Sequence, residues 1–141
     1  MDKTAELPSP LPHVAIAVFC QEARQHPDGT MTLNNILDRI TVSEAAGRLP
    51  RVASVVAVVA LRCTPPYGRH QLGLDVHQPA GAVRRIATLP VDTSPESDSI
   101  ARILRIDLEI QEFGNYWFDV VWDDRVVTRM RLSVMRAANR N

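Results

Sequence analysis

The residue types best suited to metal binding are two cysteines and four histidines, and they are scattered along the chain. A structural zinc site uses closely paired ligands, and neither Cys20 with Cys63 nor any two histidines have such a spacing. Asp75 and His77 are two residues apart, which places both side chains on one face of a strand. The sequence therefore predicts no metal and no cofactor. It leaves the pair Asp75 and His77 open as part of a ligand or acid–base site.

Acidic loops and thiols offer two further chemistries. One predicted loop contains Asp92, Glu96 and Asp98, and another contains Asp123 and Asp124. Such carboxylates can bind Ca²⁺ if the loops meet. Aspartate is equally ordinary in turns. A reactive thiol needs a neighbouring histidine or helix start, and the sequence contains no nucleophile-elbow, P-loop, dinucleotide or zinc-protease motif. We therefore expect no catalytic residue, and enzymatic activity stays an open alternative.

Charge and composition argue against nucleic acid and membrane partners. The chain of 141 residues has 16 basic and 16 acidic side chains, and aromatic residues make up only 5% of the sequence. Nucleic-acid binding draws on a basic field and on aromatic stacking surfaces. The chain start is acidic and interrupted by proline, unlike a secretory signal, and the apolar run from Val14 to Cys20 is too short to span a bilayer. We expect a cytoplasmic protein.

The elements that must position any site are predicted to be strands. Between Leu104 and Gln111 aliphatic and polar residues alternate strictly, which puts all the aliphatic side chains on one face of a strand. The alternation returns over residues 115–123 and 128–134, with turn residues at 113–115 and 123–125. We predict three strands here, joined by two hairpins into a meander.

Upstream, the pattern predicts strands over residues 13–25, 31–42, 51–62, 70–78 and 82–91. Asp28 and Gly29 predict a turn between the first two, and Pro90 indicates that the end of the last is either a sheet edge or a strand exit. Residues 43–48 could form one helical turn. About eight strands without a crossover helix predict an all-β fold, a single antiparallel two-sheet β-sandwich of immunoglobulin-like or similar type. The domain is expected over residues 13–135, with flexible tails at 1–12 and 136–141.

Two segments resemble a family of small uncharacterised bacterial proteins. These proteins open with an aliphatic strand that ends in phenylalanine or leucine followed by cysteine, here Phe19 and Cys20, and continue through an Asp-Gly turn. They close with a Gly-x-Tyr-x-Phe strand and a hairpin, matched by residues 114–118 and the run to Val134. The resemblance covers most of the chain. It implies a β-sandwich and no catalytic residue. The Gly-x-Tyr element also occurs in immunoglobulin-like domains generally, where a tyrosine anchors a strand corner.

Several apolar residues are predicted on faces that should meet water. The alternation assigns Val14, Ile16, Val18 and Cys20 to the core. It assigns to outer faces the residues Phe19, Val55, Val59, Leu61, Trp117 and Val121. An exposed apolar patch with a tryptophan usually marks an interface. The alternative is that another segment, such as residues 1–12 or 43–48, covers these side chains.

This pattern predicts a non-catalytic module that acts through protein–protein binding, either as a homodimer or with a partner subunit. Two alternatives stay open. The chain could be a structural subunit of a larger bacterial or phage assembly that pairs through sheet edges. It could also be a small-ligand-binding protein or an enzyme without a recognisable motif, because a fold does not exclude a site built upon it.

Overall fold

The computed structural model describes residues 10–43 and 49–137, and these residues form nine strands in two sheets. The strands are β1 His13–Gln25, β2 Met31–Leu37, β3 Arg39–Val42, β4 Arg51–Arg62, β5 Gly68–His77, β6 Val83–Thr93, β7 Ser99–Ile110, β8 Gly114–Trp122 and β9 Arg125–Arg136. No helix occurs among the residues described, so none is long and apolar enough to cross a membrane. The helical turn predicted over 43–48 and most of the two predicted tails fall outside the described ranges.

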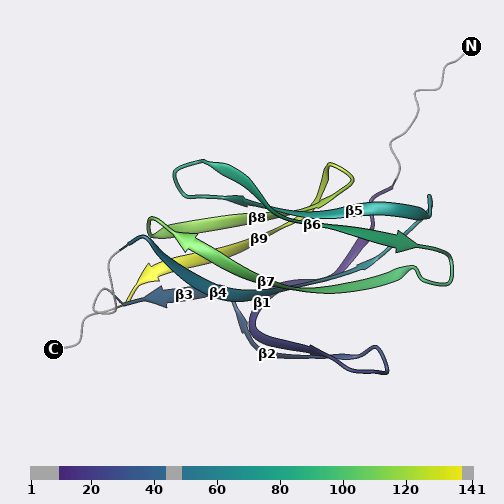
Figure 1. Ribbon diagram of the computed structural model, residues 1–141, viewed down its shortest axis with the longest axis horizontal. Coiled ribbons are helices and arrows are strands. Elements are labelled where there is room, and N and C mark those ends of the chain that lie inside the picture. Colours follow the sequence, from purple (N-terminus) through teal and green to yellow (C-terminus); the bar gives the residue numbers. More distant parts are fainter. Residues whose placement is uncertain (1–9, 44–48, 138–141) are drawn as a thin grey trace, which may run out of the picture.

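The two sheets stack on each other (Figure 1). One has four strands in the order β2-β1-β4-β7, and the other has five in the order β3-β9-β8-β5-β6. Neighbouring strands are antiparallel, except that β3 runs parallel to β9. β6 pairs only with β5, so of the two alternatives for Pro90 the sheet edge is confirmed. The all-β prediction is also confirmed.

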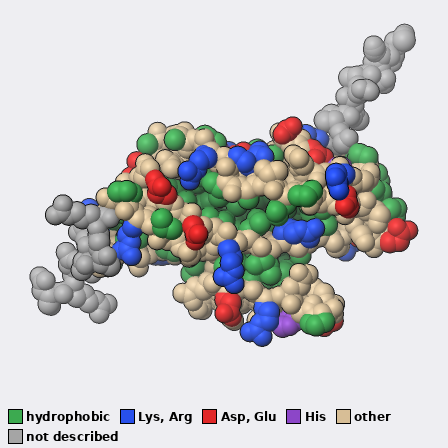
Figure 2. Space-filling model, viewed as in Figure 1, with side chains coloured by type: hydrophobic (Ala, Val, Ile, Leu, Met, Phe, Trp, Pro, Cys, Tyr) green, Lys and Arg blue, Asp and Glu red, His purple; other side chains and the backbone are tan. Residues whose placement is uncertain are grey.

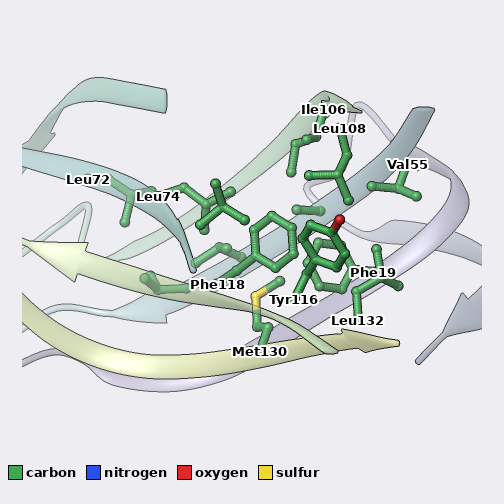
Figure 3. Close-up of a cluster of buried hydrophobic side chains, with 14 of the residues drawn as sticks. Phe19, Val55, Leu72, Leu74, Ile106, Leu108, Tyr116, Phe118, Met130 and Leu132 are labelled. Carbon is green, nitrogen blue, oxygen red and sulfur yellow. The ribbon is translucent and has the colours of Figure 1, made fainter. Parts of the chain in front are cut away.

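The main hydrophobic core lies between the sheets and takes one face of each strand (Figure 3). Its largest fully buried side chains include Tyr116, Phe19 and Phe118, and the two phenylalanine rings meet edge to face with centroids 4.8 Å apart. The Tyr116 hydroxyl donates a hydrogen bond to the backbone oxygen of Glu112 at 2.8 Å. That bond satisfies the one polar atom of a buried ring. Removing such a ring, as in Phe118→Ala, typically costs about 3–5 kcal/mol of stability.

A second, smaller cluster lies on the opposite face of the four-stranded sheet. Beyond Cys20 the strand β1 no longer pairs with β4, and its residues 21–25 form with β2 an arm that turns back beneath this sheet (Figure 1). Met31 and Leu33 of the arm pack against Cys20, Val56 and Val58, which are almost completely buried. Residues 51–62 are apolar on both faces of their strand, and the arm covers Val56 and Val58 on the face that turns away from the main core.

Two predicted strand arrangements are wrong. Residues 31–42 form two strands, because the chain leaves one sheet at Asp38 and joins the other, where β3 pairs with β9. Residues 104–111 and 115–123 are strands but do not form a hairpin, since β7 pairs with β4 and β8 with β5 and β9. Alternation fixes which side chains share a face, and it says nothing about which strand lies alongside.

Candidate functional site

The six predicted interface residues do not share one surface. Four of them lie in the main core: Phe19, Val55, Val59 and Leu61. Val121 is buried as well, and only Trp117 among the six is exposed, with 39% of its surface open. In β1 and β4 the predicted inner and outer faces are therefore reversed. Both faces of these strands are apolar, so the sequence could not show that Phe19 turns towards the five-stranded sheet while Cys20 turns towards the arm.

Trp117 belongs to a row of four side chains on the outer face of the five-stranded sheet. The register places Val83 of β6, His77 of β5, Trp117 of β8 and Arg131 of β9 side by side. Val83 is 56% exposed, and the Arg131 guanidinium lies 6.0 Å from the centroid of the Trp117 ring. This is the geometry of a cation–π contact. The row thus contains two exposed apolar side chains, Val83 and Trp117, and the positive charge of Arg131 stands beside the tryptophan.

The adjacent row is a ladder of charges on the same four strands. It runs Arg85, Asp75, Asp119, Arg129, again side by side in register. Arg129 donates from Nε to Asp119 Oδ1 at 2.6 Å, and Arg85 donates to both oxygens of Asp75. Each carboxylate thus has its own guanidinium, and the two aspartates stand opposite each other without a net charge in the ladder. We call these two rows together the Trp117 face.

His77 links the two rows of the Trp117 face. Its Nε2 lies 2.7 Å from Oδ2 of Asp119, a carboxylate that is only 5% exposed. Burial raises the pKa of Asp119, but hydrogen bonds from Arg129 and His77 outweigh burial and hold it below its ordinary value. An ionised carboxylate with both oxygens engaged is poorly placed to accept a proton from a substrate. Asp119 is therefore better suited to holding His77 and Arg129 in position than to acid–base chemistry.

Gly73 makes room for one end of the ladder. The Arg85 guanidinium lies over it, so that a Cβ at position 73 would stand 2.7 Å from Nη1 of Arg85. A glycine inside a strand often marks such a close approach. Nη1 of Arg85 also donates to Thr88 Oγ1 at 3.4 Å.

The other sequence candidates are spread over the molecule. Asp75 and His77 do share a face, but each binds a different partner across the sheet. Asp92 pairs with Arg69 at 3.5 Å at an exposed position, and the backbone oxygen of Asp98 accepts a hydrogen bond from the Cys63 amide. Within residues 10–43 and 49–137 no three histidine, cysteine, aspartate or glutamate side chains gather as they would around a metal ion.

A pocket of about 310 Å³ lies at one end of the five-stranded sheet, where the β4–β5 loop meets the β8–β9 turn. His70 stacks on Trp122 with ring centroids 4.8 Å apart. Its Nδ1 contacts the carboxylate of Asp123, and its Nε2 lies 2.8 Å from the backbone oxygen of Pro66. Burial lowers the pKa of His70, but these two acceptors outweigh burial, so the pKa lies above its ordinary value. Both ring nitrogens thus contact groups of the same chain, and His70 joins the β4–β5 loop to the β8–β9 turn. We call this arrangement the His70 clasp.

Comparisons with known proteins place the chain in a family and find solved structures that resemble it. No curated protein matches the chain. Similar solved structures include three of the β-glucosidase from Listeria innocua: one in complex with isofagomine (11% identity, TM-score 0.49), one in complex with glucose (11%, 0.48) and a third (10%, 0.49). The matches cover 86%, 84% and 86% of this chain, and the chain spans 16% of each of those longer chains. A family model matches residues 15–135, and the chain therefore belongs to DUF6941, a family of unknown function.

Proposed function

We propose that this chain is a non-catalytic β-sandwich module that binds another protein through the Trp117 face. One observation carries the proposal: a tryptophan stands exposed on the central strand of a sheet face, with an arginine guanidinium 6.0 Å from the centroid of its ring. Tryptophan and arginine are the residues that most often dominate protein–protein binding energies. We place this activity in the cytoplasm.

The charges of the Trp117 face indicate the chemistry of the partner. In the ladder each arginine is matched by an aspartate. Arg131, by contrast, has no carboxylate within 4 Å among the residues that the structure describes, and its side chain is exposed. The face therefore keeps one positive charge beside one large apolar ring. A protein segment that brings a carboxylate to Arg131 and an apolar side chain to Trp117 would complete both contacts.

The ladder prepares the face for binding. Docking costs free energy when flexible side chains must be ordered at an interface. Here Arg85, Asp75, Asp119 and Arg129 already hold one another, and His77 is bound to Asp119 directly beside Trp117. The side chains surrounding the tryptophan are thus in place before a partner arrives, and less of the binding energy is spent on ordering them.

Exposed apolar side chains gather on the same side of the molecule. Among the residues that the structure describes, seven large hydrophobic side chains are exposed, and four of them point outwards from the five-stranded sheet: Val83, Trp117, Val126 and Met135. Val126 and Met135 lie towards the two ends of β9, five residues before and four residues after Arg131, so they flank the Trp117 face on either side. These residues extend the proposed surface beyond the Trp117 face along β9.

The test compares two variants of matched chemistry. The wild-type chain, Trp117→Ala and Ile36→Ala are immobilised and exposed to a lysate of the organism that encodes the protein. Ile36 is 64% exposed and lies on the four-stranded sheet. We expect wild type and Ile36→Ala to retain the same protein and Trp117→Ala to lose it. Titration of the purified partner should then show affinity reduced by about 30-fold or more, as for an interface hot spot.

A third variant tests the partner chemistry. Arg131→Glu reverses the charge beside the tryptophan, and should weaken the same complex while leaving the fold intact, since the side chain is exposed. Equal retention by all variants, or retention of nothing by the wild-type chain, would refute the proposal. Equal binding by Arg131→Glu and wild type would refute an acidic partner.

A further inference from the structure

The two sheets have four edge strands, and three of them carry recognised protection against pairing with another chain. β3 has only four residues. β6 contains Pro90 and a break in register opposite Leu74 and Asp75. β2 is short, folded into the arm and interrupted by Asn35 in the left-handed region. Short strands, prolines and bulges block an exposed edge through its backbone, and charged side chains, which β7 does carry, are a further means.

β7 has none of these three features. It is twelve residues long, contains neither proline nor glycine, and pairs with β4 in unbroken register from Ser99 to Ile110. No other strand of the described chain pairs along its second edge. A long straight edge of this kind leaves backbone N–H and C=O groups free for another strand.

We propose that two copies of this chain pair antiparallel along β7, with Ile106 on the two-fold axis. In such a pair the axis stands perpendicular to the extended sheet, and residues equally distant from Ile106 face each other. Arg105 of each copy then stands opposite Asp107 of the other. Both side chains are exposed on the outer face of the sheet, so two ion pairs form across the axis.

The charges at the axis itself favour this register over its two neighbours, although an axis on Asp107 would also set Arg105 opposite Glu109. Moving the axis by one residue sets Arg105 opposite Arg105, or Asp107 opposite Asp107. Like charges that face each other directly across two strands destabilise the pairing, and opposite charges stabilise it. Of these three registers, only the one centred on Ile106 brings no like charges together at the axis.

A second copy would also cover apolar surface. Hydrophobic side chains gather in the middle of the view in Figure 2, between the strands that Figure 1 labels β6 and β7. Leu104 of β7 and Ile86 of β6 are only partly buried, although both pack against the main core. A strand added beside β7 would lie along this opening. Pairing would then join two four-stranded sheets into one sheet of eight strands.

This inference is independent of the proposed function, because it uses an edge of the other sheet. Trp117→Ala should leave the dimer unchanged, and variants of β7 should leave binding at the Trp117 face unchanged. Failure of one proposal is therefore distinguishable from failure of the other.

The experiment exchanges the two charges. Sedimentation velocity over a concentration series gives the dimer dissociation constant for wild type, Arg105→Asp, Asp107→Arg, the double variant and an equimolar mixture of the two single variants. Each single variant places like charges across the axis twice, and should weaken the dimer by about tenfold or more. The double variant restores both ion pairs. So does the mixture, in which a copy with two aspartates meets a copy with two arginines.

The mixture controls for effects within one chain, such as loss of the hydrogen bond that Ser54 Oγ donates to Asp107 at 2.7 Å. Circular dichroism and thermal unfolding of each variant establish that it is folded. A wild-type chain that stays monomeric throughout the series would overturn the proposal. So would single variants that dimerise as well as wild type, or a mixture that dimerises no better than its two components.

Discussion

At the scale of single residues, His70 shows how one side chain can tie separate segments together. Its two ring nitrogens contact Asp123 in the β8–β9 turn and the backbone oxygen of Pro66 in the β4–β5 loop. Both partners are acceptors, and a neutral imidazole carries only one N–H. The protonated ring alone can donate to both, which is the physical reason that the pKa of His70 is raised.

This clasp predicts a pH dependence of stability. The pKa of His70 is higher in the folded chain than in the unfolded chain, so the contribution is complete below the unfolded value of about 6.5 and is lost as pH rises through the folded value. We expect the free energy of unfolding in urea to fall by about 1 kcal/mol across that range. His70→Gln should flatten this fall, and Asp123→Asn should reduce it. An equally steep fall in His70→Gln would contradict the role given to this side chain.

Residues of the Trp117 face show what a sequence can and cannot reveal at this scale. The outward orientation of Trp117 follows from alternation along β8 and is confirmed. Its charged neighbours were missed. Counting back from the two-residue turn at Asp123 and Asp124 pairs Asp119 with Thr128, but a bulge after Val120 shifts the register by one residue. Asp119 therefore meets Arg129, and no local sequence signal marks that bulge.

At the scale of elements, the β1–β2 arm decides which side chains of β1 and β4 are inner. The turn at Asp28 and Gly29 is as predicted, with the Thr30 amide donating to Asp28 Oδ1 at 3.0 Å and Gly29 in the left-handed region. The sequence does not show that the arm turns back under its own sheet. Because of that fold, Cys20 is enclosed by the arm, and burial raises the pKa of its thiol despite a backbone hydrogen bond at Glu22.

The thiol of Cys20 can therefore report opening of the arm. In a Cys63→Ser background, which leaves one thiol, we expect Leu33→Asp to accelerate labelling of Cys20 by an aromatic disulfide reagent at least about tenfold, because a charge beneath the sheet favours the open arm. Thr32→Asp is the matched control, since Thr32 is exposed and points away from the sheet. Equal labelling rates in the two variants would show that the arm does not protect Cys20.

The wrongly predicted hairpin between β7 and β8 is also an error at the scale of elements. Strands β7 and β8 each alternate cleanly, and a short loop joins them, so the local pattern matches a hairpin. The chain instead crosses between the sheets there, with Tyr116 bonded back to Glu112 across the corner. The turn between β8 and β9 is a true hairpin, because Asp123 and Asp124 both adopt positive φ. Pairing partners that are distant in sequence, such as β5 with β8, leave no local signal.

At the scale of the whole molecule, the sequence predicts the fold class well and the binding surface poorly. Period-two alternation over most of the chain is enough to specify strands, and their apolar faces are enough to specify a core between two sheets. A binding surface depends on which strands are neighbours, and on what covers each face. Those are properties of tertiary packing, and here they moved four of the six predicted interface residues into the main core and left Val121 buried outside it.

The whole molecule then presents two separate surfaces, one on each sheet. The Trp117 face carries an exposed tryptophan beside the positive charge of Arg131. The ion pairs of its ladder hold the neighbouring charged side chains in fixed positions. The β7 edge is straight and carries charges that complement themselves about Ile106. A dimer formed through the edge would display two Trp117 faces. It would bind a repetitive or dimeric partner more tightly than a single copy could.

Photo-crosslinking inside the host cell tests the central claim most directly. A photoreactive amino acid replaces Val83, which lies in the same row as Trp117, or Val52, which is 60% exposed on the other sheet. We predict an adduct with one other protein from position 83 and none from position 52, and loss of the adduct when Trp117→Ala is added. No adduct from position 83, equal adducts from both positions, or an adduct of twice the chain's own mass would contradict binding of a partner at the Trp117 face.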